Sequence, residues 1–502
     1  MKRIFSIMLS IMIAFSFNLV GCSNENIETK VLRVCNCEDY IDEDLLAEFT
    51  EETGIEVEYS TYGTNENLYN ELVINPNSYD LVVPSEYMIE KLALEGRIQP
   101  LDFSKISGYE NNLSPFIKER LNGLKVKDGE YKDRSLYDFM VGYMWGTMGW
   151  VYNTEHVTKE EVSSWDGVFN NPNLKGQITI KDAVRDSYIV GLAMVYKDQL
   201  TEKTDNLSIT EILNRTDKVS IDAVGEKLNS IKPMLYGFEV DSGKNDIVLG
   251  NINAYVAWSG DAAYAIDVAS GEVEDDDGTF VENTRDLSYS IPEEGSNIWF
   301  DGFVMPKGSD NHDAVYKFLE FISRPESVYR NMDYTGYTGM LANGEFTLED
   351  EETGEEYQTN LFNEVVVGWF DESQDLEDGE GKLVDFSYFF GDEGDYSIIV
   401  SEEGYGRLLA QYPTKEIVER CAIMGNYDSN TLMDINDMWE SVKGETFSLW
   451  FIIVIACLVV LMFSVILIYR NKEKFPWLKL PERKTRKIKK GYKIVKIEEV
   501  EL

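Results

Sequence analysis

Two cysteines one residue apart form the pair of side chains best suited to bind a metal or to undergo redox chemistry. Cys35 and Cys37 lie in the stretch VLRVCNCEDY. Alternate residues of an extended strand share a face, so both thiols could point the same way. A zinc site would need about two further ligands. The chain has only two histidines, His156 and His312, with no cysteine near either of them. We therefore predict no metal site and no cofactor.

The sequence lacks the residue patterns that are typical of enzymes. The chain has no Gly-x-Ser-x-Gly motif and no phosphate-binding glycine-rich loop that ends in Lys and Ser or Thr. Two histidines offer little material for general acid–base catalysis. Carboxylate pairs of the glycosidase kind are expected by chance among 90 Asp and Glu. The sequence therefore predicts that the protein is not an enzyme.

The net charge restricts the possible partners. The 502 residues carry a formal charge of -44, and 43% of them are hydrophobic, enough to bury a sizeable core. A surface this acidic repels nucleic acid and favours cations. The length exceeds that of one ordinary core, so two lobes or domains with added segments are expected.

The C-terminal region departs from this acidic average. Residues 470–502 contain twelve Lys or Arg and five Glu, and they follow the segment FSLWFIIVIACLVVLMFSVILIY, residues 447–469, which has no charged residue. A helix of that length extends roughly 34 Å, enough to cross the hydrocarbon core of a bilayer. We predict a transmembrane helix over 447–469 and, by the positive-inside rule, a basic cytoplasmic tail over 470–502.

The N-terminus predicts export. Lys2 and Arg3 precede a long apolar run, which is typical of a secretory signal peptide over 1–21. The run ends in LVGC, which resembles the lipobox of bacterial lipoproteins. That resemblance implies lipidation of Cys22 and leaves residues 22–30 as a tether. The predicted location is the cell membrane, with the binding domain extracellular or periplasmic.

Strands and helices alternate along the exported part. Strand patterns over 31–35, 55–62 and 79–85 alternate with amphipathic helix patterns over 42–54 and 65–73. Acidic residues in the first turn of the 42–54 helix suit the helix dipole. Such alternation predicts α/β lobes with mostly parallel sheets. Ligands of such sheets bind beyond the carboxyl ends of the strands.

Five blocks of the sequence resemble the spermidine/putrescine-binding proteins of bacterial ABC importers. They are EDYIDEDLLAEFTEETGIEVEYSTYGTNENLYNEL, YDLVVPSEYMIEKLALEGRIQPLD, YMWGTMGWVYN, AWSGDAAYAI and IWFDGFVMPKGSDNHDAVYKFLEFISRPE. The resemblance implies an α/β, two-lobed periplasmic-binding-protein fold of type II, with a hinge between the lobes and a polyamine in the cleft. It also implies ABC permease subunits and their ATPase as partners.

A polyamine site needs carboxylates for the ammonium groups and aromatic rings for the methylene stem, and cation–π contacts serve both. Asp182 and Asp186 match the family's paired acids around an Arg, although Ala183 stands where relatives have an acid. The residues that match the family's binding motifs are Tyr40, Ser85, Tyr87, Asp182, Asp186, Trp258, Trp299, Asp301 and Tyr337.

The chain also departs from the family pattern. Cys37 stands where many relatives have an aromatic residue, and Gly425 and Asn426 stand where a Gln would reach the ligand. These departures leave spermidine, putrescine or another small cationic solute open as the ligand. A membrane-anchored solute sensor of the same fold is the alternative function.

The segment 344–406 is longer and more acidic than a family loop, yet it contains the apolar stretches LFNEVVVGWF and VDFSYFF. It is interpreted as an inserted subdomain or β-rich flap, with a solvated loop or a partner-contact surface as alternatives. The predicted organisation is lobe 1 over 31–145 and 299–343, lobe 2 over 146–298 and 407–443, and the acidic insertion over 344–406.

Overall fold

The computed structural model describes residues 31–202, 207–270, 272–274, 280–282, 285–350, 353–374, 376–377 and 379–444. The predicted signal peptide 1–21, the tether with Cys22, the helix 447–469 and the tail 470–502 lie outside the described residues. Within the described residues, no helix combines the length and apolarity needed to cross a membrane.

The first lobe is built on parallel strands β1 (Val31–Cys37), β2 (Glu56–Tyr62) and β3 (Leu81–Val82). Helices α2 (Asp44–Thr53), α3 (Asn65–Ile74) and α4 (Glu86–Leu94) connect and follow these strands. Helix α2 ends at Gly54, whose φ of 69° is a left-handed conformation that glycine adopts without steric cost. The predicted alternation of strands and helices is confirmed here.

The second lobe has the same architecture. Strand β6 (Ile178–Lys181) pairs in parallel with β7 (Gly237–Glu239) and β8 (Ala254–Trp258). The helices of this lobe include α8 (Val184–Val195), α11 (Lys218–Ile231), α12 (Gly243–Leu249) and α13 (Ser259–Ala269). Helix α20 (Ser429–Lys443), near the end of the described residues, also packs on this lobe. The ring of its Trp439 lies 5.2 Å from the ring of Phe238 on β7.

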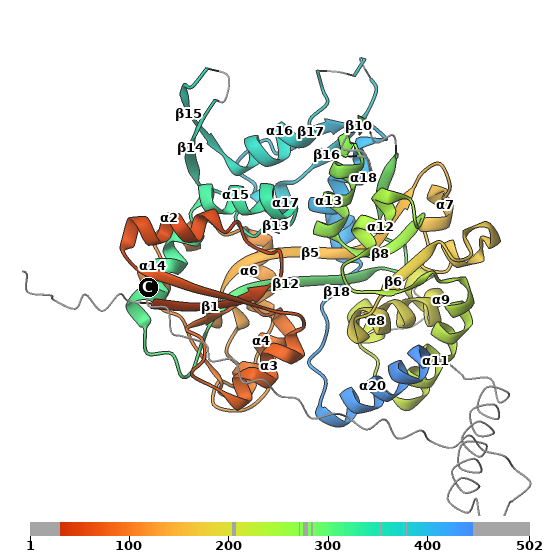
Figure 1. Cartoon of the computed structure of the whole chain (residues 1–502), viewed down its shortest axis with the longest axis horizontal. Helices are drawn as coiled ribbons and strands as arrows, with labels where there is room; N and C mark the ends of the chain where they lie inside the picture. Colours follow the sequence, from red (N-terminus) through yellow and green to blue (C-terminus); the bar gives the residue numbers. More distant parts are fainter. Residues whose placement is uncertain are drawn as a thin grey trace, which may run out of the picture. The chain divides into compact units, whose positions relative to one another are not determined.

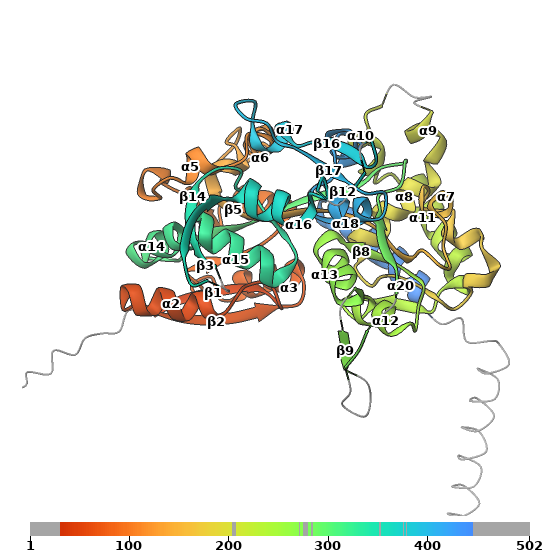
Figure 2. The same cartoon turned by 90° about the horizontal axis from the view of Figure 1, so that it is seen from above.

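Two long antiparallel strands join the lobes. One half of β5 (Met140–Asn153) pairs with β12 (Ser296–Pro306), and the other half pairs with β8 and β11 (Leu287–Ser290). The strand order β2-β1-β3-β12-β5-β8-β6-β7 therefore runs from one lobe into the other through β12 and β5. Figures 1 and 2 show both strands between the two groups of helices. Because the sheet of the described residues passes from one lobe to the other through these two strands, we expect the hinge to lie there.

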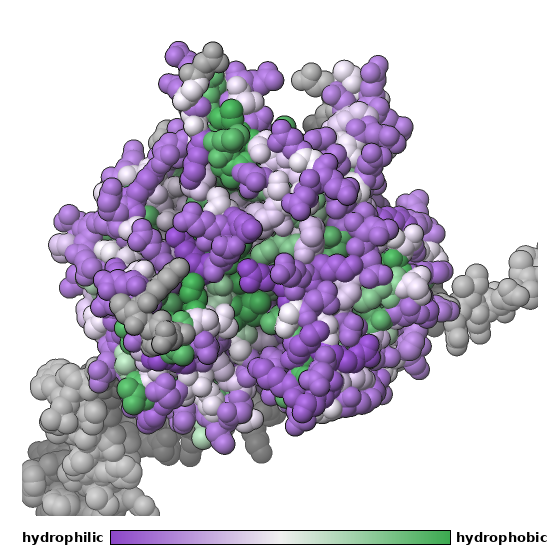
Figure 3. Space-filling model, turned by 180° about the vertical axis from the view of Figure 1, so that it is seen from behind, coloured by the Kyte–Doolittle hydropathy of each residue, from purple (hydrophilic) through white to green (hydrophobic). Residues whose placement is uncertain are grey.

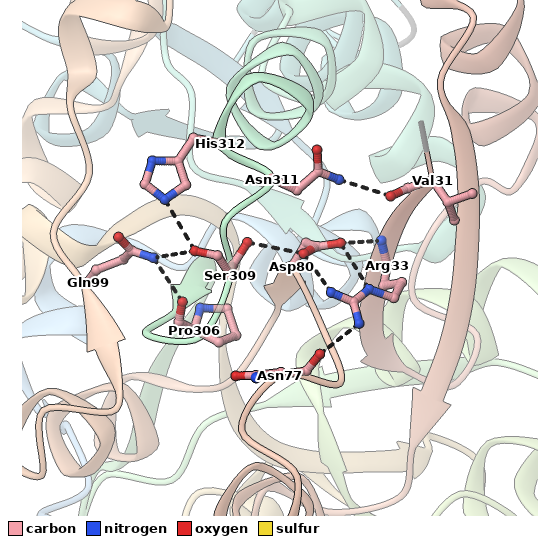
Figure 4. A network of polar contacts seen from close by, with 9 residues as sticks. All are labelled: Val31, Arg33, Asn77, Asp80, Gln99, Pro306, Ser309, Asn311 and His312. Carbon is pink, nitrogen blue, oxygen red and sulfur yellow. Dashed lines mark hydrogen bonds and ion pairs between the residues drawn. The ribbon is translucent and has the colours of Figure 1, made fainter. Parts of the chain in front are cut away.

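A partly buried ion pair joins β1 to the residue that precedes β3 in the first lobe (Figure 4). The Nη2 atom of Arg33 on β1 lies 2.9 Å from Oδ1 of Asp80, and the Ser309 hydroxyl donates to the same oxygen. Burial opposes ionisation of Asp80, yet hydrogen bonds from Arg33 hold the pKa of this carboxyl below its usual value. His312 lies in the same network, 3.2 Å from the carbonyl oxygen of Ser309. This histidine is thus part of a structural contact.

The acidic segment 344–406 is folded within its described residues. It contains the hairpins β14 (Glu345–Glu349)–β15 (Glu356–Asn360) and β16 (Lys382–Asp385)–β17 (Ser397–Val400), separated by the π-helical turn η6 (Phe362–Val367) and the short helix α16 (Gly368–Phe370). Both hairpins lie at the top of the view in Figure 1.

Aromatic side chains anchor this segment to the rest of the protein. Phe389, in the short helix α17 (Ser387–Phe390), is fully buried and stacks on Trp145 of β5 at 5.4 Å. The Ser114 hydroxyl donates to the carbonyl oxygen of Phe389 at 2.6 Å. The segment therefore shares the core next to the hinge, although its outer residues are acidic.

The hydrophilic surface agrees with the many charged residues of the sequence. The face of the molecule seen in Figure 3 is mostly hydrophilic, with small hydrophobic areas between the polar ones.

In the described part of the chain, no group of three or more His, Cys, Asp or Glu side chains is arranged to hold a metal ion. Cys35 is buried in the first lobe, and Cys37 is partly exposed; both are free thiols.

Candidate ligand-binding site

Three of the predicted aromatic residues meet beside the hinge. The rings of Tyr40 and Tyr337 lie 5.0 Å apart, and those of Trp299 and Tyr337 lie 5.6 Å apart, in edge-to-face geometry. Tyr143 of β5 adds a fourth ring, 5.4 Å from Tyr40, and its hydroxyl donates to the Tyr40 carbonyl at 2.6 Å. Tyr143 was missed as a site residue, although it opens one of the blocks that carry the family resemblance.

Asp301 is the carboxylate of this aromatic group. The Tyr40 hydroxyl donates to its Oδ2 at 2.9 Å, while its Oδ1 has no hydrogen-bond partner and only 8% of the residue is exposed. Burial raises the pKa of Asp301 to about 6, although the nearby Ser85 hydroxyl and the hydrogen bond from the Tyr40 hydroxyl favour its ionised form. A buried carboxylate oxygen without a partner is costly, and a cation would satisfy it.

The position of Asp301 follows from local backbone irregularity. The register between β12 and β5 shifts between Asp301 and Gly302, as in a β-bulge. Asp301 forms an isolated bridge with Ser85, the residue that precedes α4. Bulges redirect side chains near functional sites. Asn65 of α3 binds both the backbone N–H and the hydroxyl of Ser85, at 3.1 Å each, and so holds the bridge in place.

Glu86 lies directly behind this bridge and was not predicted. Its Oε2 accepts a hydrogen bond from the backbone N–H of Phe300 at 2.8 Å, its Oε1 has no partner, and only 1% of the residue is exposed. Burial raises the pKa of Glu86 to about 8, with the charge of Asp301 adding to the rise. Burial thus favours the protonated form of Glu86, which lies next to the ionisable Asp301.

The replacement Glu86→Gln tests this protonation state. Glu86 has a folded pKa of about 8 and an ordinary value of 4.5, so the folded state binds the extra proton between these values. The stability that this proton contributes is full below the ordinary pKa and is lost as the pH rises. Relative to the variant, the wild type should lose up to about 1.4 kcal/mol per pH unit of unfolding free energy over that window.

Urea unfolding of both proteins at several pH values between 4.5 and 9 measures this difference. Glu51→Gln on the exposed side of α2 is the matched control. A difference between Glu86→Gln and wild type that is flat with pH would show that Glu86 is ionised in the folded protein.

The predicted acids of the second lobe lie at the start of α8. The backbone N–H of Asp182 donates to the Glu239 carbonyl at 2.6 Å, which joins β6 to β7 at their carboxyl ends. Asp186 lies in the first turn of α8. Burial raises the pKa of Asp186 to about 6, although the nearby Lys181 ammonium and the Trp258 indole favour its ionised form.

The face of the Trp258 ring is occupied by an ammonium group of the protein itself. The ammonium nitrogen of Lys181, the last residue of β6, lies 4.1 Å from the centre of the Trp258 ring. It also lies 3.2 Å from Oδ2 of Asp261 and donates to the Val240 carbonyl at 2.8 Å. Sequence reasoning missed Lys181; its only signal was a charged residue ending an apolar strand just before the predicted acids.

Tyr87 is likewise covered by a side chain of the protein. The guanidinium of Arg185 lies 4.1 Å from the centre of the Tyr87 ring, and its Nε lies 3.2 Å from Oε1 of Glu66 on α3. Nη1 of Arg185 donates to the carbonyl oxygen of Gly425 at 2.9 Å, and Oδ1 of the adjacent Asn426 is buried without a partner. Arg185 thus links α3 and α4 of the first lobe to α8 and the C-terminal segment.

A second contact joins the lobes next to the aromatic group. The Tyr337 hydroxyl donates to Oδ1 of Asp261 at 3.0 Å, while the other carboxylate oxygen of Asp261 pairs with Lys181. The site residues of the two lobes are therefore in direct contact.

Burial raises the pKa of the Cys37 thiol, at the end of β1, to about 12, so this thiol is neutral.

Comparisons with known proteins agree with this architecture. Residues 44–345 match the family described as bacterial extracellular solute-binding protein. The chain is 30% identical over 340 residues to the putrescine-binding periplasmic protein PotF of Escherichia coli strain K12, covering 66% of this chain and 83% of that protein. It is 30% identical over 333 residues to the putrescine-binding periplasmic protein SpuD of Pseudomonas aeruginosa, covering 65% and 82%.

Among solved structures, the chain is similar to the spermidine/putrescine ABC transporter substrate-binding protein PotD of Streptococcus pneumoniae. The TM-score is 0.55 at 26% identity, with 82% of this chain and 98% of that chain covered. The predicted two-lobed α/β fold is thereby confirmed.

Proposed function

The chain belongs to the bacterial extracellular solute-binding proteins, and from this premise we propose that it captures a polyamine outside the cell and delivers it to the permease of an ABC importer. Members of this family bind solutes for transport, so the expectation that the chain is not an enzyme is confirmed. The permease subunits and their ATPase are the proposed partners.

The single observation that carries the proposal is the carboxylate of Asp301 within a group of aromatic rings. Its unpaired oxygen is suited to an ammonium group, and the rings of Tyr40 and Trp299 are suited to a methylene stem. The relatives PotF and SpuD are named for putrescine binding, which agrees with this chemistry.

Thermal shift of the full-length chain in a mild detergent tests the proposal. A ligand that binds only the folded protein raises its melting temperature. Putrescine and spermidine should raise it at concentrations where amino acids, sugars and thiamine leave it unchanged. No shift with any polyamine, together with a clear shift for a sugar, would exclude a polyamine as the ligand.

We also propose that the protein is held at the membrane at both ends. Lipidation of Cys22 and a membrane helix over 447–469, followed by a cytoplasmic tail over 470–502, are supported by the sequence patterns alone. Double attachment would keep the binding domain close to its permease. We also propose the lobe boundaries: lobe 1 comprises residues 31–145 and 299–343, and lobe 2 comprises residues 146–298 and 407–443.

Truncation after Gly444 combined with Cys22→Ala should release the protein from membranes. The parent chain should remain in the pellet after alkaline carbonate extraction, and each single change should still leave it there, at least in part. A parent chain that is fully extracted by carbonate would contradict the membrane helix, because a spanning helix is effectively permanent in the bilayer.

A further inference from the structure

Lys181 occupies a place in the site that a ligand ammonium would otherwise take. Its Nζ lies over the Trp258 ring at 4.1 Å, 3.2 Å from Asp261 and 3.5 Å from Glu239, and only 1% of the residue is exposed. The contacts are those of a cation bound on an aromatic face between carboxylates. They bind Lys181 firmly, since a buried ammonium is stable only when it is paired.

The remaining charges of the site can then be assigned. Arg185 pairs with Glu66, and Lys181 pairs with Asp261 and Glu239. For the residues that the structure describes, Asp186 and Asp301 form no ion pair with a Lys or Arg nitrogen, although the charges of Lys181 and Arg185 are near enough to Asp186 to favour its ionised form. Asp301 belongs to the first lobe, on β12, and Asp186 belongs to the second lobe, in the first turn of α8.

We propose that Lys181 is a specificity-determining residue, which fills the Trp258 position with an internal ammonium and so makes the site select a diamine over a triamine. The inference rests on the proposed function, because it concerns which polyamine is bound. A diamine can pair one ammonium with Asp301 and the other with Asp186. A third ammonium near Trp258 would be repelled by Lys181.

Calorimetric titration of the full-length wild type and of Lys181→Met with putrescine and spermidine tests this selectivity. Methionine keeps most of the volume of the side chain and removes its charge. We expect the wild type to bind putrescine more tightly than spermidine, and the ratio of the two dissociation constants to move toward spermidine by about tenfold or more in Lys181→Met. An unchanged ratio in a folded variant would mean that Lys181 only stabilises the fold, and would overturn the inference.

The double variant Lys181→Met/Asp261→Asn is the matched comparison. It restores the charge balance but removes the carboxylate that would receive the third ammonium, so the ratio should return toward that of the wild type. If neither variant folds, the two dissociation constants of the wild type still test the inference. Binding of spermidine that is as tight as, or tighter than, binding of putrescine overturns it. Failure of the wild type to bind any polyamine would instead overturn the proposed function, so the two failures are distinguishable.

Discussion

Replacing Asp301 with Asn should weaken polyamine binding by roughly ten- to hundredfold, or about 1.5 to 3 kcal/mol, the range for hydrogen bonds to charged groups. The amide is nearly isosteric and can still accept the hydrogen bond from the Tyr40 hydroxyl, which lies 2.9 Å from Oδ2 in the wild type. The variant therefore loses the charge and keeps the geometry. Calorimetric titration with putrescine measures the change.

Asp437→Asn, on the exposed face of α20, is the matched control and should leave the affinity unchanged. Since Asp301 is buried with an oxygen that has no partner, its replacement should not lower the melting temperature of the unliganded protein. An affinity equal to that of the wild type would remove Asp301 from the ligand site.

Phe389→Ala should destabilise the protein by about 3 to 5 kcal/mol, as is typical when a large buried aromatic side chain is truncated. Phe389 is fully buried, stacks on Trp145 of the hinge strand β5 and lies within the acidic segment 344–406. The cavity would open next to the rings of Trp145 and Tyr412, which lie 5.4 and 5.5 Å from the ring of Phe389. Urea unfolding followed by tryptophan fluorescence measures the loss.

Leu383→Ala in β16 of the same segment is the matched control. Leu383 is 70% exposed, so its truncation should change the unfolding free energy by no more than about 0.5 kcal/mol. Similar small effects of both replacements would mean that the segment is only loosely attached and does not share the core. The contrast between the two residues thus separates the anchored part of the segment from its exposed hairpin.

The sequence could predict the elements of the first lobe because their signals are local. The helix over 42–54 has acidic residues in its first turn, an apolar stripe and a glycine at its end, and α2 is observed as Asp44–Thr53. Likewise α3 begins after Thr64, whose side chain accepts a hydrogen bond from the backbone N–H of Asn67. The acidic segment was harder to interpret, because its apolar residues pack on β5, far away in the sequence.

For the candidate site, too, some features could be predicted from the sequence and others could not. The sequence alone determined the residue types: an acidic chain without catalytic patterns, with aromatic and carboxylate residues at strand ends in the order seen in polyamine-binding relatives. From these, Tyr40, Trp299, Asp301 and Tyr337 could be grouped as site residues before any geometry was known. Residue type and order suffice there because the family resemblance supplies the long-range information.

Only the tertiary structure decided which charges remain for a ligand. Lys181 pairs with Asp261 across 80 residues, Arg185 with Glu66 across 119, and Tyr40 donates to Asp301 across 261. No local periodicity encodes such pairings, since they depend on how the strands of both lobes meet at the hinge. Pairing and burial then determine which carboxylate is neutralised, which is protonated and which is left for a cation.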